Sequence, residues 1–270
     1  MPSDVSAEVI SNTPLSSDYN VLALAAPAIA EAAVPGQFVM VKAGSGHDPL
    51  LRRPFSVFEI LNNGAGIPTG FSLLNKRIGP STSRLYSARP GDQVAVLGPL
   101  GKPFTLVNPP SEAWMVAGGV GLAPFATLAS ALINAGVSTT LFYGARRSEE
   151  LFYVDWFLSL GVTMVLTTED GSRGEHGRVI APLESALAAR AAEAPVTLYA
   201  CGPEGMLAAT ARTAAKFSRA CQVSVERTMG CGMGGCYSCV VPMLNEQGQR
   251  HHVRSCLAGP VLDAARVCWE

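Results

Sequence analysis

The sequence predicts a multidomain chain of the β plus α/β class, with an antiparallel β-barrel domain, a parallel α/β domain and a small C-terminal module. Three observations predict it. Short apolar runs separated by turn residues fill residues 1–107. Apolar runs alternate with Ala-rich stretches in residues 108–221. Residues 222–270 are rich in Gly and Cys, so these three ranges are the expected domains.

In the first domain, turn residues mark where strands begin. Gln37–Lys42 follows Pro35-Gly36, and Gln93–Leu97 follows Pro90-Gly91-Asp92. Strands that recur with Pro-Gly punctuation are typical of a small antiparallel barrel or sandwich.

The second domain begins near Asn108-Pro109-Pro110, where strands start to alternate with helices. This alternation is typical of a parallel α/β sheet, and no helix is expected after about Cys221. The expected strands are Trp114–Ala117, Thr139–Tyr143, Thr163–Thr167 and Val196–Ala200. The expected helices are Ala123–Asn134, Ser148–Leu160, Pro182–Ala192 and Glu204–Phe217.

Charge and cysteine content exclude several classes of protein. The formal net charge is −1 and charged residues make up 15% of the chain, so we expect no nucleic-acid partner. Seven cysteines is an odd number, which argues against a secreted disulfide framework. The N-terminus, Met1-Pro2-Ser3-Asp4, lacks the cationic segment of a secretory signal. We therefore expect a reducing, cytoplasmic location.

One uncharged stretch, from Ala113 to Ala145, has the length of a membrane span. A buried strand, loop and helix explain it better, because glycines and a proline interrupt it, and no membrane insertion is expected. These interruptions are Gly118, Gly119, Gly121, Pro124 and Gly136.

A glycine loop, Gly119-Val-Gly121-Leu-Ala-Pro124, follows the first strand of the α/β domain and opens a helix. Glycines there allow the backbone to approach a pyrophosphate, and the helix start supplies free N–H groups. Pro124 replaces the third Gly of the usual dinucleotide fingerprint, so a packing turn is the competing interpretation.

Two further turns lie at the same edge of the predicted sheet, where open α/β sheets bind ligands. Cys201-Gly202-Pro203 follows a strand, although a tight turn with a buried Cys explains it equally well. In Thr168–Gly171, Asp170 could accept from ribose hydroxyls and would repel a 2′-phosphate, which favours NAD over NADP. Arg146 and Arg147 favour the opposite choice.

The first domain carries two candidate anion-binding features. In Arg52–Ser56, an Arg can bind phosphate, and Phe55 and Ser56 offer a stacking face and a hydrogen-bonding group to a ring system. Gly79–Ser83 precedes an expected helix at Arg84–Ala88. Both could be ordinary surface features, yet together they favour a dinucleotide such as FAD.

Four cysteines, Cys231, Cys236, Cys239 and Cys256, have the spacing C-x4-C-x2-C-x16-C, which is typical of a [2Fe–2S] cluster. Structural zinc more often takes two close C-x2-C pairs. A Rieske centre needs two His ligands, and His251-His252 lack that context, so we expect both to face solvent. Glycines in the loop allow amide N–H groups to turn toward the sulfurs. Cys221 and Cys268 fit no ligand spacing.

From about residue 5 to residue 269 the chain resembles the ferredoxin-reductase-like flavoproteins, most closely the electron-transfer subunits of type B dihydroorotate dehydrogenases. The resemblance also includes Gly98–Gly101 and the Gly-Gly-x-Gly-x-x-Pro loop. It departs where Ser81 replaces the Gly of a Gly-Thr pair and where Asn75 replaces a frequent aromatic residue. It implies FAD contacts at Arg53, Pro54, Phe55, Ser56, Leu74, Asn75, Lys76, Ser81 and Thr82, NAD(H) contacts at Gly119, Gly121, Pro124, Cys201, Gly202 and Pro203, and cluster ligands at the four cysteines. Asp170 joins the candidate NAD(H) residues as the ribose contact described above.

The resemblance implies the direction of chemistry as well. NADH would pass a hydride to FAD, the flavin would release single electrons to the cluster, and the cluster would exchange them with the FMN of a catalytic subunit in a heterotetramer of pyrimidine biosynthesis. That subunit would interconvert dihydroorotate and orotate, and the physiological flow would run from dihydroorotate to NAD. Hydride transfer needs alignment more than an acid or base, so no catalytic residue is expected. The competing interpretations are a related subunit of an NADH-dependent ferredoxin:NADP oxidoreductase, sulfide dehydrogenase or hydrogenase, a self-sufficient NADH:acceptor reductase, and a zinc-binding module without enzyme activity.

Overall fold

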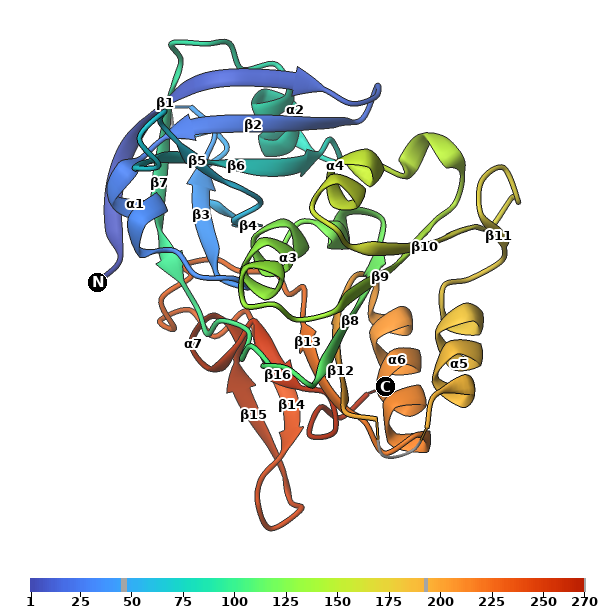
Figure 1. Cartoon of the computed structure of the whole chain (residues 1–270). Coiled ribbons are helices and arrows are strands. Elements are labelled where there is room, and N and C mark those ends of the chain that lie inside the picture. Colours follow the sequence, from blue (N-terminus) through green and yellow to red (C-terminus); the bar gives the residue numbers. More distant parts are fainter. Residues whose placement is uncertain (45–47, 192–193, 270) are drawn as a thin grey trace. The chain divides into compact units, whose positions relative to one another are not determined.

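The computed structural model of the chain describes residues 1–44, 48–191 and 194–269 (Figure 1). The chain divides into two units by its internal contacts. Unit 1 consists of Met1–Pro103, Arg227–Val240 and Arg254–Pro260, and unit 2 consists of Phe104–Glu226, Val241–Val253 and Val261–Glu270. The C-terminal part of the chain thus contributes to both units. The three domain ranges stated above stay a prediction.

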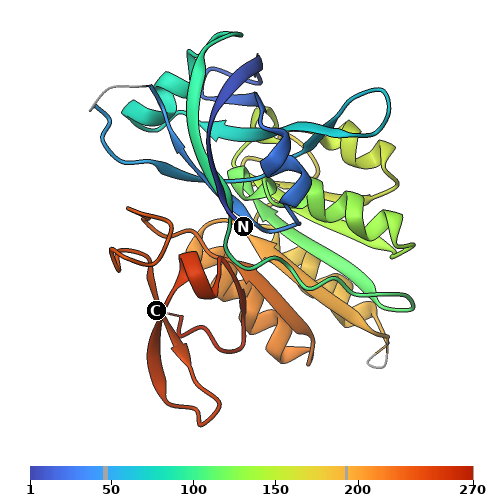
Figure 2. The ribbon, with the colours of Figure 1, turned by 90° about the vertical axis from the view of Figure 1, so that its left-hand side faces the viewer.

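Unit 1 contains a seven-stranded antiparallel sheet with the order β4-β3-β7-β1-β2-β6-β5. The sheet is strongly curled (Figure 2), and the segment after β4 closes onto β6. Phe58 N donates to Ser72 O, and Ser72 N donates to Glu59 O, both at 2.9 Å. This curled sheet confirms the predicted antiparallel barrel. Its strands are β1 (Ser3–Pro14), β2 (Tyr19–Ala25), β3 (Phe38–Lys42), β4 (Arg53–Ser56), β5 (Ile60–Asn62), β6 (Pro68–Lys76) and β7 (Gln93–Leu100).

Two short helices, α1 (Pro27–Ala32) and α2 (Pro80–Tyr86), accompany this sheet. The expected helix at Arg84–Ala88 was placed too late in the sequence. It begins at Pro80, because the Thr82 hydroxyl accepts from Gly79 N at 3.0 Å and Ile78 N at 2.9 Å and so satisfies N–H groups at the helix start.

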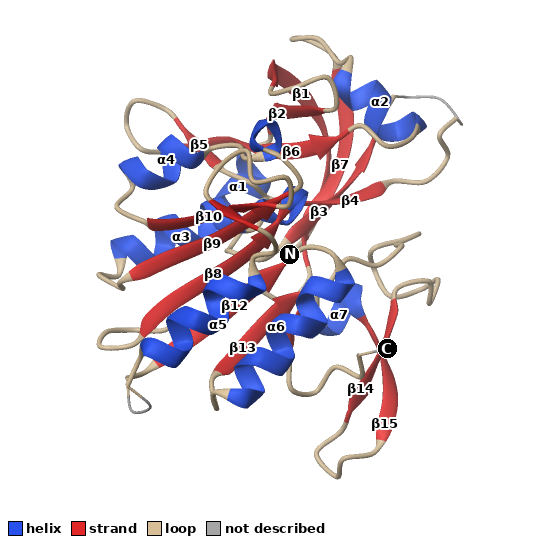
Figure 3. Ribbon diagram, turned by 90° about the vertical axis from the view of Figure 1, so that its right-hand side faces the viewer, coloured by secondary structure: helices blue, strands red, loops and turns tan. Residues whose placement is uncertain are grey.

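Unit 2 contains a sheet with the order β11-β10-β9-β8-β12-β13-β16, parallel except for its last strand. Figure 3 shows α5 and α6 on one face of this sheet and α3 on the other, as the alternating pattern predicts. The strands are β8 (Glu112–Gly118), β9 (Thr139–Ala145), β10 (Thr163–Thr168), β11 (Glu175–His176), β12 (Val196–Cys201), β13 (Ala220–Ser224) and β16 (Val261–Asp263). The helices are η1 (Gly119–Leu122), α3 (Phe125–Asn134), η2 (Ser148–Glu150), α4 (Val154–Ser159), α5 (Ile180–Ala189) and α6 (Glu204–Lys216).

The expected helix Ser148–Leu160 is interrupted. Only η2 and α4 are helical, and Tyr153 between them has φ 58°, a left-handed conformation that ends a right-handed helix. The neighbouring Leu151 and Phe152 are both buried.

The last part of the chain forms β14 (Val240–Leu244), β15 (Arg250–Arg254) and a four-residue helix, α7 (Ser255–Ala258). The expectation of no helix after Cys221 was therefore wrong. One helical turn is too short to give a periodic apolar pattern. Within the described residues, no helix is long and apolar enough to cross a membrane.

Candidate functional site

The four predicted ligand cysteines all belong to unit 1. Three lie in the segment Cys231–Cys239, called here the cysteine loop, and Cys256 lies on α7. Cys239 and Cys256 are buried, Cys231 is partly buried and Cys236 is exposed. Ser255 N donates to Cys239 O at 2.9 Å, which joins the loop to the start of α7.

Glycine is required at two positions of the cysteine loop. Gly232 has φ 72° and Gly234 has φ 84°, which L side chains rarely adopt. A Cβ atom would lie 2.5 Å from Met40 Cγ at Gly232 and 2.5 Å from Leu257 Cδ1 at Gly234. The loop therefore packs tightly onto both β3 and α7.

Backbone and hydroxyl groups donate toward the sulfurs, as the glycine content predicts. Met233 N donates to Cys231 Sγ at 3.4 Å, and Ser238 Oγ lies 3.1 Å from Cys236 Sγ. The Ser238 hydroxyl, and after it the Ser238 and Cys231 amides, lower the pKa of Cys236 to about 6. Such donors stabilise thiolate, the form that binds metal.

The four thiols lie close enough to affect one another's pKa. Cys231 contacts Cys236, and burial together with the adjacent Cys239 thiol raises the pKa of Cys256 to about 12. Among residues 1–44, 48–191 and 194–269, no group of three or more His, Cys, Asp or Glu side chains is arranged to hold a metal ion. Four neighbouring thiols, with N–H donors around them, fit a two-iron cluster with four Cys ligands.

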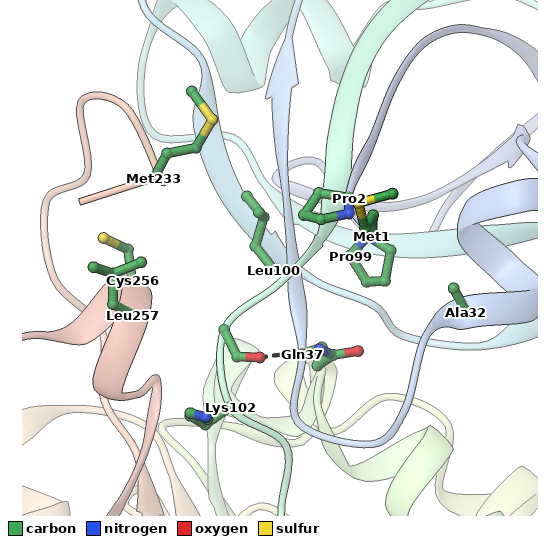
Figure 4. A pocket seen from close by; sticks show the side chains of 12 residues that line it. Met1, Pro2, Ala32, Gln37, Pro99, Leu100, Lys102, Met233, Cys256 and Leu257 are labelled. Atoms are coloured by element: carbon green, nitrogen blue, oxygen red, sulfur yellow. Dashed lines mark hydrogen bonds between the residues drawn. The ribbon is translucent and has the colours of Figure 1, made fainter. Parts of the chain in front are cut away.

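The cysteine loop is built directly on the curled sheet of unit 1. Cys239 and Cys256 share an apolar cluster with Phe38, Met40 and Leu100 from β3 and β7. A pocket of about 500 Å³ lies beside them, with Gln37 Nε2 donating to Gly101 O at 3.0 Å (Figure 4). The pocket is lined by Met1, Pro2, Ala32, Gln37, Pro99, Leu100, Gly101, Lys102, Gly232, Met233, Cys256 and Leu257.

The first predicted flavin segment, Arg53–Ser56, is β4, at one edge of the sheet. Arg53 is exposed, and its Nη1 donates to Leu51 O at 3.0 Å and Arg52 O at 3.1 Å. Pro54, Phe55 and Ser56 are partly buried. An edge strand leaves backbone groups available to a ligand, so this placement suits a binding segment.

The other predicted flavin residues lie beside β4, since β4 and α2 both contact β6. Leu74, Asn75 and Ser81 are buried. The Thr82 side chain caps α2, and Lys76 Nζ lies 5.2 Å from the centre of the Tyr19 ring. The structure thus groups the predicted flavin segments. The Asn75 and Thr82 side chains, however, form hydrogen bonds within the protein.

Asn75 belongs to a hydrogen-bonded chain of three asparagines, in which Asn20 and Asn75 are buried and Asn12 is partly buried. No sequence pattern predicts this chain of asparagines. Asn75 Nδ2 donates to Asn20 Oδ1 at 2.7 Å and to Thr82 O at 3.0 Å. Asn20 Nδ2 donates to Asn12 Oδ1 at 2.6 Å, and Asn12 donates to carbonyls at the end of α2. These residues, on three different strands, fix α2 against the sheet.

The predicted nicotinamide segments meet within unit 2, at the carboxyl ends of the adjacent strands β8 and β12. A Cβ atom at Gly121 would lie 2.2 Å from Cys201 O, and one at Gly118 would lie 2.9 Å from Pro203 Cδ. Packing of the two turns therefore requires these glycines. Gly119 differs, because it has φ 54° and open space around it, and Pro124 directly precedes α3.

Cys201 is buried, and its thiol is held neutral. Burial, and after it the Glu226 carboxylate, raise the pKa of Cys201, while Ser224 donates a hydrogen bond to it. A neutral buried thiol is a poor nucleophile, so the residue can pack against a ligand without reacting with it.

Asp170 lies two residues after the end of β10 and organises its own turn. Its Oδ1 accepts from Ser172 Oγ at 2.6 Å and Ser172 N at 2.9 Å, and the Ser172 hydroxyl is the first cause that lowers its pKa. Asp170 N donates to Arg146 O at 3.1 Å. Asp170, which favours NAD, therefore lies beside Arg146, which favours NADP.

Ser238 is a site residue that the sequence reading missed. Its Oγ accepts from Gly230 N at 3.0 Å as well as contacting Cys236. Its position between two predicted ligands was an available signal. The histidines differ in exposure: His252 is exposed as expected, whereas His251 is partly buried.

Two family models match the chain. The iron-sulfur cluster binding domain of dihydroorotate dehydrogenase B matches residues 226–268, and an oxidoreductase NAD-binding domain matches residues 115–212. These ranges contain the cysteine loop and the glycine loop. The predicted iron–sulfur and nicotinamide cofactors are confirmed by these matches.

Solved structures with the same fold include the NADH-dependent reduced ferredoxin-NADP oxidoreductase, at 27% identity and a TM-score of 0.83, covering 98% of this chain and 90% of that one. A ferredoxin NADP+ reductase from Neisseria gonorrhoeae with bound FAD and NADP has 18% identity and a TM-score of 0.66, covering 79% of this chain and 91% of that one. Both confirm the fold predicted by the resemblance.

Curated relatives cover nearly the whole chain. One from Desulforamulus reducens is 37% identical over 91% of this chain and 90% of its own length, and one from Bacillus caldolyticus is 39% identical over 91% of each. Both are named dihydroorotate dehydrogenase B (NAD(+)), electron transfer subunit. The chain therefore belongs to the family of electron transfer subunits of dihydroorotate dehydrogenase B.

Proposed function

We propose that this chain passes electrons between NAD(H), FAD and a [2Fe–2S] cluster, and exchanges them with the FMN of a dihydroorotate dehydrogenase catalytic subunit. One observation within unit 1 carries the proposal. Met40 of β3 is adjacent to both segments: it is paired in register with Pro54 of β4, and its Cγ would lie 2.5 Å from a Cβ atom at Gly232 of the cysteine loop. The candidate flavin segment and the cluster segment therefore both lie against β3.

Each group supplies a different chemistry: nicotinamide carries a hydride, the cluster carries one electron, and FAD interconverts the two. The residues of the chain bind and orient these groups, since hydride transfer depends on alignment. We assign FAD binding to Arg53, Pro54, Phe55, Ser56, Leu74, Asn75, Lys76, Ser81 and Thr82, NAD(H) binding to Gly119, Gly121, Pro124, Asp170, Cys201, Gly202 and Pro203, and cluster ligation to Cys231, Cys236, Cys239 and Cys256.

The name of the relatives, electron transfer subunit, implies a catalytic partner. Exposed apolar side chains surround the cysteine loop and support a docking surface there: Met233 is 60% exposed, Tyr237 62% and Leu257 44%. Exposed apolar groups of this kind, close together, favour a protein interface. We propose a cytoplasmic heterotetramer with the FMN-containing subunit.

A second candidate function follows from the solved NADH-dependent reduced ferredoxin-NADP oxidoreductase, which matches 98% of this chain. A subunit of such a complex would bind the same three groups and a different partner. The identity of 27% is lower than the 37% to the dihydroorotate dehydrogenase B subunit, so we favour the latter.

The test is reconstitution with a dihydroorotate dehydrogenase B catalytic subunit. We expect a stable complex that reduces NAD+ when dihydroorotate is added, measured by NADH absorbance, and no reduction by either chain alone. Absence of a complex together with fast reduction of ferredoxin would favour the second candidate. A purified chain with zinc and without flavin absorbance would exclude both.

A further inference from the structure

Arg254 precedes the fourth cysteine by two residues and reaches back to the cysteine loop. Its Nη1 donates to Gly234 O at 2.7 Å. Its guanidinium carbon lies 4.5 Å from the centre of the Tyr237 ring, within the range of a cation–π contact. One side chain therefore contacts the loop at two points, between Cys231 and Cys236 and between Cys236 and Cys239.

Gly234 is the point at which the loop and the fourth cysteine are joined. Its N–H donates to the Cys256 thiol, and its carbonyl accepts from Arg254. Leu257 leaves no room for a side chain there, since a Cβ atom would lie 2.5 Å from its Cδ1. Residues 254, 256 and 257 thus hold one peptide segment of the loop in place.

Among the residues that the structure describes, Arg254 forms no ion pair. The ion pairs of the described residues involve other arginines and Lys216. A cluster with four thiolate ligands is anionic, and one-electron reduction makes it more so. A nearby positive charge favours the reduced form, and charge and hydrogen bonds around the sulfurs are known determinants of the potential.

We infer that Arg254 is a positioning residue for the iron–sulfur cluster: it holds the cysteine loop on α7 and raises the reduction potential of the cluster. This inference rests on the proposed function only in that a cluster is bound. Loss of Arg254 should therefore loosen the cluster and lower its potential, which are separate effects. Lys and Met separate them, because Lys keeps the charge without the planar fork and Met keeps neither.

The test uses the full chain with its cofactors and four variants: Arg254→Met, Arg254→Lys, Tyr237→Leu and the control Arg250→Met. Arg250 is exposed at the other end of β15. Two quantities are measured: the midpoint potential of the cluster, by an EPR-monitored redox titration, and the rate of iron release to a chelator.

We expect iron release to be roughly tenfold faster in Arg254→Met, as for other residues that support metal ligands. The same variant should have a lower midpoint potential. Arg254→Lys should release iron faster than the wild type with a potential close to it, and Arg250→Met should change neither quantity. Unchanged release and potential in Arg254→Met, or the same changes in Arg250→Met, would overturn the inference.

If Arg254→Met does not fold, Tyr237→Leu tests the inference instead. The Tyr237 side chain is 62% exposed, so its replacement does not open the core. Faster iron release from Tyr237→Leu supports the inference, and wild-type release from both Tyr237→Leu and Arg254→Lys contradicts it. A wild-type chain without iron and acid-labile sulfide would instead contradict the proposed function.

Discussion

At the scale of single residues, exposure distinguishes the four ligand candidates. Cys239 and Cys256 are buried in an apolar cluster with Met40 and Leu100, so replacing either also perturbs packing. Cys236 is exposed, and the Ser238 hydroxyl lowers its pKa more than any other neighbour does. Cys236 therefore offers the cleanest substitution for testing the cluster.

Cys236→Ser should remove the cluster and abolish electron transfer to the partner, while the flavin still passes electrons from NADH to a dye. A serine oxygen replaces thiolate poorly as an iron ligand. The measurement is iron content together with the two rates. Cys268→Ser is the control, since Cys268 lies outside the ligand spacing. Partner transfer at the wild-type rate in Cys236→Ser would remove the cluster from the electron route.

Gly121 and Gly205 give a matched pair in unit 2. Gly121→Ala should weaken NADH binding and destabilise the fold by about 1–3 kcal/mol, because the new Cβ would lie 2.2 Å from the Cys201 carbonyl oxygen. Gly205→Ala, in α6 with open space around it, should leave the KM for NADH unchanged and slightly raise stability. Equal KM values in both variants would contradict a nucleotide role for this turn.

At the scale of elements, the asparagine chain explains how α2 is held. The helix has only seven residues, too few to be stable alone. Asn75 bonds to Thr82 O in its first half, and Asn12 bonds to Leu85 O, Tyr86 O and Ala88 O at its end. The carbonyls at a helix end lack partners within the helix, so Asn12 satisfies groups that would otherwise be unpaired.

Asn20→Ala should destabilise unit 1 by about 2 kcal/mol, because it leaves the buried amide of Asn75 and the partly buried amide of Asn12 without their shared partner. We also expect weaker FAD binding, because α2 carries Ser81 and Thr82. Chemical denaturation and FAD titration of the stripped chain measure the two effects. Asn62→Ala, at an exposed site, should change neither. Unaltered stability in Asn20→Ala would show that the chain of asparagines does not anchor α2.

The ion pair between Glu112 of β8 and Arg190, just after α5, predicts a pH dependence. Burial alone would raise the pKa of Glu112, but hydrogen bonds from Arg190 and Trp114 and the guanidinium charge lower it overall. Because the pKa of Glu112 is lowered in the folded state, its ionised carboxyl stabilises the fold at pH values above the unfolded-state pKa. This contribution is lost as the pH falls through the folded-state pKa. Glu112→Gln should thus cost up to about 1 kcal/mol near neutral pH.

The difference between wild type and Glu112→Gln should disappear in acid, when the wild-type carboxyl is protonated. Denaturant unfolding at several pH values measures it. A difference that persists in acid would mean that packing, and not charge, makes the contribution of Glu112.

At the scale of the whole molecule, the sequence predicts the two kinds of sheet because each has its own period and turn residues. Gln37–Lys42 and Thr139–Tyr143 were recognisable from apolar pattern alone, and they are β3 and β9 with small shifts of their ends. The helix break at Tyr153 and the single helical turn that contains Cys256 could not be recognised from the sequence, because both depend on tertiary packing.

The candidate site likewise has features that the sequence predicts and features that only the structure shows. Spacing identifies the four cysteines and the glycine loop, since the chemistry requires those residue types at those intervals. Spacing could not show that Asn75 serves the fold, that Gly121 packs against the Cys201 carbonyl, or that Arg254 reaches Gly234. These are contacts between residues distant in the chain, and a single sequence carries no pattern for them.

The contacts also show that the cysteine loop is part of unit 1. Met229, Cys239 and Cys256 pack with Phe38 and Leu100 in one apolar cluster. The cluster segment therefore shares a core with the sheet that carries the candidate flavin strand. This arrangement supports the central claim that electrons pass from flavin to cluster within one folded unit.

The most direct test of that claim is anaerobic reduction of the complete chain by NADH, followed by EPR of rapidly frozen samples. We expect the signal of a reduced [2Fe–2S] cluster when FAD is bound, and no such signal after FAD has been stripped from the same preparation. A cluster that NADH reduces equally well without FAD, or that stays oxidised with FAD bound, would contradict the account.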